Sequence, residues 1–281
     1  MMMKRFILLV LFVTTTQFLK AQYLESFEHV GEIGVSVGTA NYFGDLNTGI
    51  NFNQAKQSAA IHYTKQMNNY IGFKISATYA FLAYADKYSD NIVQQTRNLS
   101  FNTDVWEFSV NGTFNFFKFH PGFEGYDYTP YVGLGIGVFN FDPYTYLKGE
   151  KYFLRGIGTE GQGSDEYPER APYKNTAICI PLTLGFKYAF NSSVNIFTEF
   201  RYRFTSTDYL DDVSTTYAPD AFTPGSIGYL LSDRSYETGV SIAKQGRQRG
   251  NTLGKDAFAT MHFGVSFNLQ AYRCPGRSGL F

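Results

Sequence analysis

The residues of this chain that could do chemistry are mostly charged side chains embedded in apolar segments. Seven of them alternate with bulky apolar neighbours; they are Glu32, Lys74, Glu107, Lys187, Glu199, Arg201 and Arg203. His62 and His262 occupy the same kind of position. Three carboxylates against four bases nearly balance, and a buried charge is costly unless it is paired. We therefore predict a neutralising plug of ion pairs, with a proton or substrate path as the alternative.

A second group of polar residues lies between the apolar segments. The acidic run Asp208, Asp211 and Asp212 offers oxygen ligands for calcium, but it lacks the spacing and the closing Glu of an EF-hand. We expect a solvated loop or a partner contact there, with His120 and Glu124 of another connection as further partner-contact candidates. A basic run in the same connection either pairs with the acidic run or contacts anionic lipid headgroups: Lys244, Arg247 and Arg249.

Signals for cofactor binding or catalysis are weak. Residues 156–161 match G-x-G-x-x-G, but the sequence shows neither the preceding strand nor the following helix that a dinucleotide site requires. The four histidines are scattered, and no spacing places a nucleophile beside one of them. We predict a protein that is not an enzyme and has no cofactor, metal or small-molecule substrate.

The composition excludes several classes of protein. Lys and Arg total 24 and Asp and Glu total 24, so a zero net charge argues against a nucleic-acid-binding surface. Charged residues make up only 17% and aromatic residues 18% of the chain. No run of eighteen apolar residues follows the N-terminus, which excludes a bundle of membrane helices. The combination indicates a β protein in an unusual environment.

Eight segments alternate with period two, as β-strands do; they are residues 30–44, 57–66, 70–83, 103–117, 131–141, 177–190, 194–205 and 257–270. One face of each is bulky and apolar, and the other is mostly Gly, Ser, Thr, Asn and Ala. A face in bulk water would be rich in Lys and Glu. We therefore expect the small polar face to line a narrow lumen and the apolar face to contact lipid. Pro181 removes a ladder hydrogen bond from its segment, so we expect a bulge or a displaced strand end there.

These segments predict an all-β fold, an eight-stranded antiparallel transmembrane β-barrel of the outer-membrane type. Only a closed barrel pairs every backbone group in hydrocarbon, and a spanning strand needs about 9–11 residues. The connections alternate between short and long, the longest being residues 142–176 and 206–256. Outer-membrane barrels have short periplasmic turns and long extracellular loops. We therefore place the protein in the cell outer membrane, with both termini in the periplasm.

The chain divides into three parts. Residues 1–21 are expected to be an export signal peptide, with Lys4 and Arg5 before an apolar stretch and a cut near Ala21. An uncleaved anchor is the alternative. Residues 22–270 form the barrel, and residues 271–281 form a C-terminal periplasmic tail. Cys179 and Cys274 are expected to be unpaired.

Five stretches of the sequence resemble a known family. They are residues 31–38 (GEIGVSVG), 41–47 (NYFGDLN), 180–188 (IPLTLGFKY), 207–217 (TDYLDDVSTTY) and 249–251 (RGN). They are similar to segments of the PorG-like outer-membrane barrels of the type IX secretion system. The resemblance implies a non-enzymatic barrel that associates with a periplasmic ring of the lipoprotein PorK and its partner PorN. It also implies a role in protein secretion and, in some bacteria, gliding motility, and it offers no catalytic residues.

Two other functions fit the same barrel. The long loops could carry a surface enzyme or adhesin, because long loops are often functional. An open lumen would make the protein a small passive pore.

Overall fold

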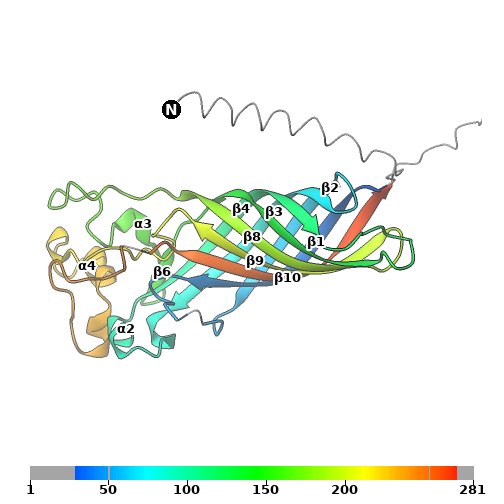
Figure 1. The fold of residues 1–281 in the computed structure, drawn as a ribbon. Coiled ribbons are helices and arrows are strands. Elements are labelled where there is room, and N and C mark those ends of the chain that lie inside the picture. The colour runs from blue at the N-terminus through cyan, green and yellow to red at the C-terminus, as the bar shows by residue number, and fades with distance from the viewer. Residues whose placement is uncertain (1–28, 50, 253, 271–281) are drawn as a thin grey trace, which may run out of the picture.

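The computed structural model describes residues 29–49, 51–252 and 254–270. The predicted signal peptide (residues 1–21), the C-terminal tail (271–281) and Cys274 lie outside these residues, whereas Cys179 is a free, buried thiol. Eight long antiparallel strands form a barrel: β1 (His29–Phe43), β2 (Lys56–Gln66), β3 (Ile71–Ala85), β4 (Ser100–Asn115), β5 (Tyr128–Asn140), β8 (Thr176–Ala189), β9 (Val194–Thr205) and β10 (Ala257–Gln270). Each pairs with its neighbour in the chain order of these eight strands, and β1 pairs with β10 to close the barrel (Figure 1). The predicted fold is confirmed.

The apolar faces of the strands point outward. Ile136, Leu184 and Phe263 are 60%, 54% and 62% exposed, although a water-soluble protein would bury such side chains. Because successive residues of a strand point to opposite faces, this arrangement turns the intervening positions toward the barrel axis. The exterior is therefore a continuous apolar belt.

Pro181 lies in the middle of β8 without a bulge. The register between β8 and its two neighbours is unbroken, so the predicted bulge or displaced end is wrong. The ladder to β5 simply lacks the pairs at Ile180 and Pro181, while the ladder to β9 keeps both. A missing N–H on one side of the strand is therefore accommodated by omitting pairs rather than by shifting the register.

The connections at the two ends of the barrel differ in length and in structure (Figure 1). Short turns join β2 to β3, β4 to β5 and β8 to β9 at one end. The long connections at the other end fold into what we call the cap, which comprises the described residues of 44–55, 86–99, 141–175 and 206–256. It contains the short elements η2 (Asp86–Tyr88), α2 (Ile92–Arg97), β6 (Tyr144–Leu147), β7 (Glu150–Phe153), α3 (Leu154–Ile157), η3 (Pro219–Ala221), α4 (Ile227–Ser232) and η4 (Ser235–Thr238). None of the described helices has the length and apolar character needed to cross a membrane.

The interior of the barrel has two layers. Toward the short turns it is polar, as predicted. Toward the cap it is a hydrophobic core of large side chains, including Tyr42, Leu82, Phe101, Phe139 and Phe258, so the prediction of small polar residues along the whole lumen is wrong at that end. The cap excludes water from the barrel mouth by adding Leu46, Leu154, Leu210 and Leu231 to the same core. Inward positions there are free to be bulky and apolar.

Candidate functional site

The seven predicted charged residues all lie inside the barrel, and we call them the lumen cluster. They come from β1, β3, β4, β8 and β9 and are Glu32, Lys74, Glu107, Lys187, Glu199, Arg201 and Arg203, all buried. Three of them occupy alternate positions of β9, which turns them to the same face of the strand. The alternation that builds the barrel thus also brings these charges together.

Every member of the lumen cluster has an oppositely charged partner. Lys187 pairs with Glu32, and Glu199 pairs with both Lys74 and Arg201. Arg203 Nε donates to Glu107 Oε2 at 2.8 Å, and Arg201 Nη1 lies 3.8 Å from Glu107 Oε1. These contacts link β3, β4 and β9 into one chain of ion pairs, and the Lys187–Glu32 pair joins β8 to β1 separately.

Neutral side chains also donate to the Glu199 and Glu32 carboxylates of the lumen cluster. Tyr131 donates to Glu199 at 2.7 Å, while Asn195 and Ser266 donate to Glu32 at 2.9 and 2.8 Å. The cavity left beside Glu32 has a volume of about 10 Å³, which is room for about one water molecule. The side chains therefore fill the lumen at this level.

The lumen also contains a serine–histidine contact that the sequence reasoning missed. Residues 34–38 read G-x-S-x-G, and Ser36 Oγ lies 3.3 Å from His262 Nδ1. Ser36 sits in the middle of β1, however, and not in the strand-to-helix turn that exposes a hydrolase nucleophile. The other ring nitrogen, Nε2, lies 2.9 Å from Ser58 Oγ, and both Ser36 and His262 are buried. The contact ties β1, β2 and β10 together and offers no access to a substrate.

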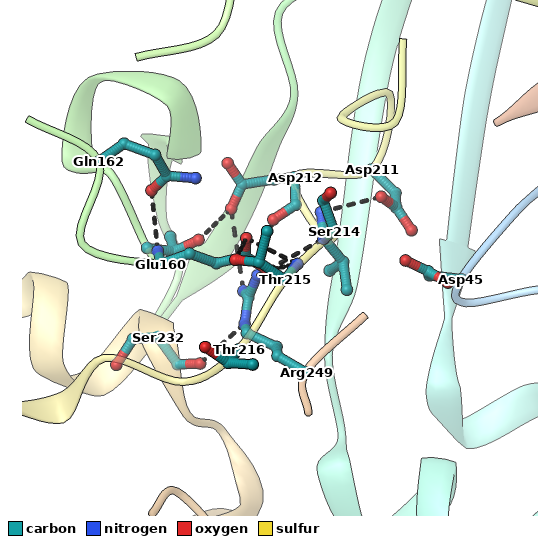
Figure 2. A network of polar contacts seen from close by, with 12 residues as sticks. Asp45, Glu160, Gln162, Asp211, Asp212, Ser214, Thr215, Thr216, Ser232 and Arg249 are labelled. Carbon is teal, nitrogen blue, oxygen red and sulfur yellow. Dashed lines mark hydrogen bonds and ion pairs between the residues drawn. The ribbon is translucent and has the colours of Figure 1, made fainter. Parts of the chain in front are cut away.

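A second buried network, the cap network, joins the long loops around Glu160 (Figure 2). The Glu160 carboxylate accepts from the backbone N–H groups of Ser214 and Thr215 at 2.9 and 3.0 Å. It also accepts from the Thr215 hydroxyl at 2.5 Å and from Arg249 Nη1 at 3.1 Å. One carboxylate therefore joins residues 141–175 of the cap to two separate stretches of residues 206–256.

The G-x-G-x-x-G motif of residues 156–161 serves this network. Gly158 and Gly161 adopt φ angles of 67° and 82°, and residues other than glycine rarely adopt such angles. The turn that they form carries Thr159 and Glu160 into the cap interior, where Thr159 donates to Asp212. The motif thus shapes a turn that supports the cap.

Arg97 and Arg249 connect the loops further. Arg97 forms an ion pair with Asp86 at 2.7 Å and donates to the backbone oxygen of Arg249 at 2.5 Å. Arg249 in turn donates to the Asp212 carbonyl at 2.7 Å and to the Ser232 carbonyl at 3.2 Å. Sequence reasoning missed Arg97 and Glu160, since no periodicity marks a residue in a loop.

Carboxyl groups outnumber bases in the cap. Tyr42 Oη lies 2.5 Å from Asp211 Oδ2 and 3.0 Å from Asp256 Oδ1. A phenol has one proton to donate, so the second contact is a hydrogen bond only if one carboxyl keeps its own proton. Burial, together with the neighbouring carboxylates, raises the pKa of both Asp211 and Asp256 well above the ordinary value. Within the described ranges, no three His, Cys, Asp or Glu side chains are grouped to hold a metal ion.

The predicted partner-contact residues do not form one site. Asp208, Asp211 and Asp212 are buried in the cap, so the expected solvated loop is wrong, and these side chains are not available to a partner. The run is buried because the cap loops fold over it. His120 and Glu124 lie in the β4–β5 turn at the opposite end, where the His120 ring packs edge-on against Phe123.

The predicted pairing of the basic run with the acidic run holds for one residue. Arg249 lies 3.8 Å from the Asp212 carboxylate. Lys244 and Arg247 are exposed.

Comparison with solved structures gives distant likenesses. Neisserial surface protein A is 13% identical with a TM-score of 0.42, covering 87% of this chain and 100% of that one. OprG of Pseudomonas aeruginosa is 10% identical with a TM-score of 0.39, covering 87% and 98%. Ail of Yersinia pestis is 9% identical with a TM-score of 0.38, covering 86% and 100%. Such low identities transfer no function.

Sequence comparison assigns the chain to a family. No curated protein matches it. A family model described as a domain of unknown function, DUF6089, matches residues 4–244, which is most of the chain. The protein therefore belongs to the DUF6089 family.

Proposed function

We propose that the protein is a non-conducting outer-membrane anchor of the type IX secretion system that associates with its periplasmic ring. The observation that carries the anchor role is a closed barrel with an apolar exterior and an interior filled by ion pairs and aromatic side chains. Such a barrel contacts lipid with its exterior and has no open channel through its interior. The secretion role is supported by the resemblance of residues 31–47, 180–188 and 207–217 to PorG-like barrels.

The asymmetry of the two ends supports an orientation. Membrane barrels of this class have short turns on the periplasmic side and long loops outside. The cap is accordingly extracellular, and the short turns and both termini are periplasmic. A periplasmic ring of PorK and PorN would then meet the short-turn end.

The β4–β5 turn is the part of that end best suited to dock a partner. Phe119 is buried in the barrel mouth, where Lys187 Nζ lies 5.4 Å from its ring centre. This contact fixes the base of the turn, while Phe123 and Glu124 remain exposed. An exposed aromatic residue on a fixed turn is a suitable anchor for a protein interface.

Crosslinking followed by affinity purification from intact envelopes tests the proposal. We expect PorK and PorN to copurify with the wild-type barrel. The double variant Phe123→Ser/Glu124→Arg should lose them, while the amount of barrel in the outer membrane stays unchanged. The matched control is Glu169→Arg, because Glu169 is exposed in the cap at the other end. Recovery of the barrel without ring components would overturn the secretion role.

Conductance tests the anchor role independently. A silent planar bilayer is expected for the wild type, because the lumen cluster and the hydrophobic core both block the axis. Steady conductance would favour a passive pore.

The folded cap favours a second candidate, a surface adhesin or enzyme. The Arg249–Glu160 ion pair and the hydrogen bonds of Arg97 to the Arg249 and Asp45 carbonyls join the four loops, which present a defined outer surface. If this surface binds a target, a variant with an opened cap should lose binding while secretion continues.

A further inference from the structure

The hairpin of β6 and β7 has two unlike faces. One face packs into the cap, where Leu147 joins the hydrophobic core and the Thr145 hydroxyl is 3.0 Å from Ser100 Oγ. The register pairs Tyr144 with Phe153 and Tyr146 with Lys151, so these four side chains share the other face. Tyr146 and Phe153 are 51% and 48% exposed. Tyr144 is buried, whereas the described part of the chain leaves Tyr146 and Phe153 uncovered.

This face continues the apolar belt of the barrel. Tyr144 pairs with Asn102 of β4, and Asn102 points to the same side of β4 as Asp104 and Trp106 because alternate residues share a face. Trp106 is exposed, and its ring lies 5.0 Å from that of Tyr79 on the neighbouring strand. Figure 1 shows β6 at the base of the cap, next to the barrel rim. The hairpin therefore lies directly beyond the aromatic end of the belt.

Two lysines give this face a positive charge. Lys151 Nζ lies 3.5 Å from the centre of the Tyr144 ring and 4.8 Å from that of Phe153, and Lys148 is exposed in the hairpin turn. Neither lysine forms a salt bridge within the described ranges. Tyr152 donates to Glu150 at 2.5 Å and Tyr79 donates to Asp104 at 2.6 Å, and Asp142 is the carboxylate that interacts with Lys151.

We propose that the exposed face of the β6–β7 hairpin rests on the lipid headgroup layer on the cap side of the membrane. Tyr146 and Phe153 enter the interface, as aromatic side chains do at a membrane boundary. Lys148 and Lys151 bind the phosphate groups of anionic lipids. The inference rests on the membrane insertion proposed above, and it identifies lipid as the occupant because the face is continuous with the lipid-facing belt and carries the complementary charge.

Tryptophan fluorescence tests the placement, because Trp106 is the only tryptophan of the chain. The full-length protein is reconstituted into phosphatidylcholine/phosphatidylglycerol vesicles. In the double variant Trp106→Phe/Tyr146→Trp, the introduced indole should be quenched by lipids labelled near the headgroup and shielded from iodide in the buffer. The control, Trp106→Phe/Tyr236→Trp, places the indole on exposed η4 of the cap, where iodide should quench it. Equal iodide quenching of the two indoles would overturn the proposal.

A measurement on the wild-type protein distinguishes an error in the hairpin proposal from an error in the proposed membrane insertion of the barrel. Trp106 itself should be quenched by lipids with brominated acyl chains. If it is not, insertion is wrong; if it is quenched while the indole at position 146 stays in water, only the hairpin proposal is wrong.

The lysines are tested by the preference of the protein for anionic over zwitterionic lipid, measured with spin-labelled lipids. Lys148→Gln and Lys151→Gln should each lower this preference roughly fivefold, the effect of one basic residue near an anionic surface. Lys244→Gln/Arg247→Gln is the matched control and should leave it unchanged. An unchanged preference in the Lys148→Gln/Lys151→Gln variant would overturn the phosphate contact.

Discussion

The lumen cluster and the cap network both bury charge, but they balance it differently. In the lumen, three carboxylates face four bases, and each has an ionic partner. The buried acidic and basic side chains of the described cap residues are seven carboxyls and two arginines: Asp86, Glu160, Asp208, Asp211, Asp212, Asp233 and Asp256 against Arg97 and Arg249. The lumen can remain charged throughout, whereas the cap must retain protons or use neutral donors to hold its acids.

This difference makes the stability of the cap depend on pH. Burial raises the pKa of Asp208 and of Asp212 to about 6 in the folded cap, although the Ser214 hydroxyl and the Arg249 guanidinium respectively oppose the rise. An exposed Asp titrates at about 4. The folded cap therefore holds protons that the open loops would release, and this contribution to stability is lost as the pH rises through about 6.

The largest effect is expected from breaking the lumen cluster. Glu199→Gln leaves Lys74 without its carboxylate and Arg201 with only the more distant Glu107. Removing one partner of a buried ion pair costs about 3–5 kcal/mol. We expect that loss in the free energy of unfolding, measured by urea titration of the reconstituted barrel. Glu169→Gln, on an exposed residue, is the control, and a change below about 0.5 kcal/mol for Glu199→Gln would contradict the pairing.

A smaller and more local effect is expected from Arg249→Gln. The variant removes the charge that holds Glu160 and Asp212. The free energy needed to open the cap should therefore fall by about 2–3 kcal/mol, while the barrel stays folded. Limited proteolysis should then cleave within residues 206–256, with the strands intact. Arg247→Gln, two residues away and exposed, should remain resistant. Resistance of the Arg249 variant would show that the hydrophobic core alone closes the cap.

Comparing the protein at two pH values tests directly whether the excess of buried carboxyl groups over arginines makes the cap sensitive to pH. Hydrogen exchange in residues 206–256, corrected for the intrinsic rate, should show less protection at pH 8 than at pH 5, while β9 and β10 stay equally protected. Asp212→Asn should reduce the difference, because the amide does not titrate and Asn tolerates the positive φ of 66° at this position. Equal protection of the cap at both pH values would refute the idea that it depends on retained protons.

The smallest effect concerns Pro181 of β8, a residue that belongs to neither network. Pro181→Val supplies the N–H that the β5–β8 ladder lacks, and we expect it to stabilise the barrel by about 0.5–1 kcal/mol. The same urea titration measures it. A destabilisation would mean that the proline ring packs better against Arg203 and its neighbours than a paired valine does.

The sequence by itself determined the barrel and the membership of the lumen cluster. Segments such as residues 194–205 carry the period-two alternation over their whole length, and the observed strand β9 has the same bounds. Alternation is a local property of a strand, so it also assigned Glu199, Arg201 and Arg203 to the interior before any partner was known. It did not say which charge pairs with which, because that depends on the register between strands.

Only the tertiary structure decided which residues of the long loops meet in the cap. Arg97 meets the Arg249 carbonyl across 152 residues, and Glu160 meets Ser214 across 54. No periodicity records such contacts, since each loop follows its own irregular path. The same packing buried the acidic run that its composition marked as solvated, and it made inward Phe139 and Phe258 part of a hydrophobic core. Local alternation sets which way a strand residue points, whereas the surroundings of that residue depend on loops that fold back from distant parts of the chain.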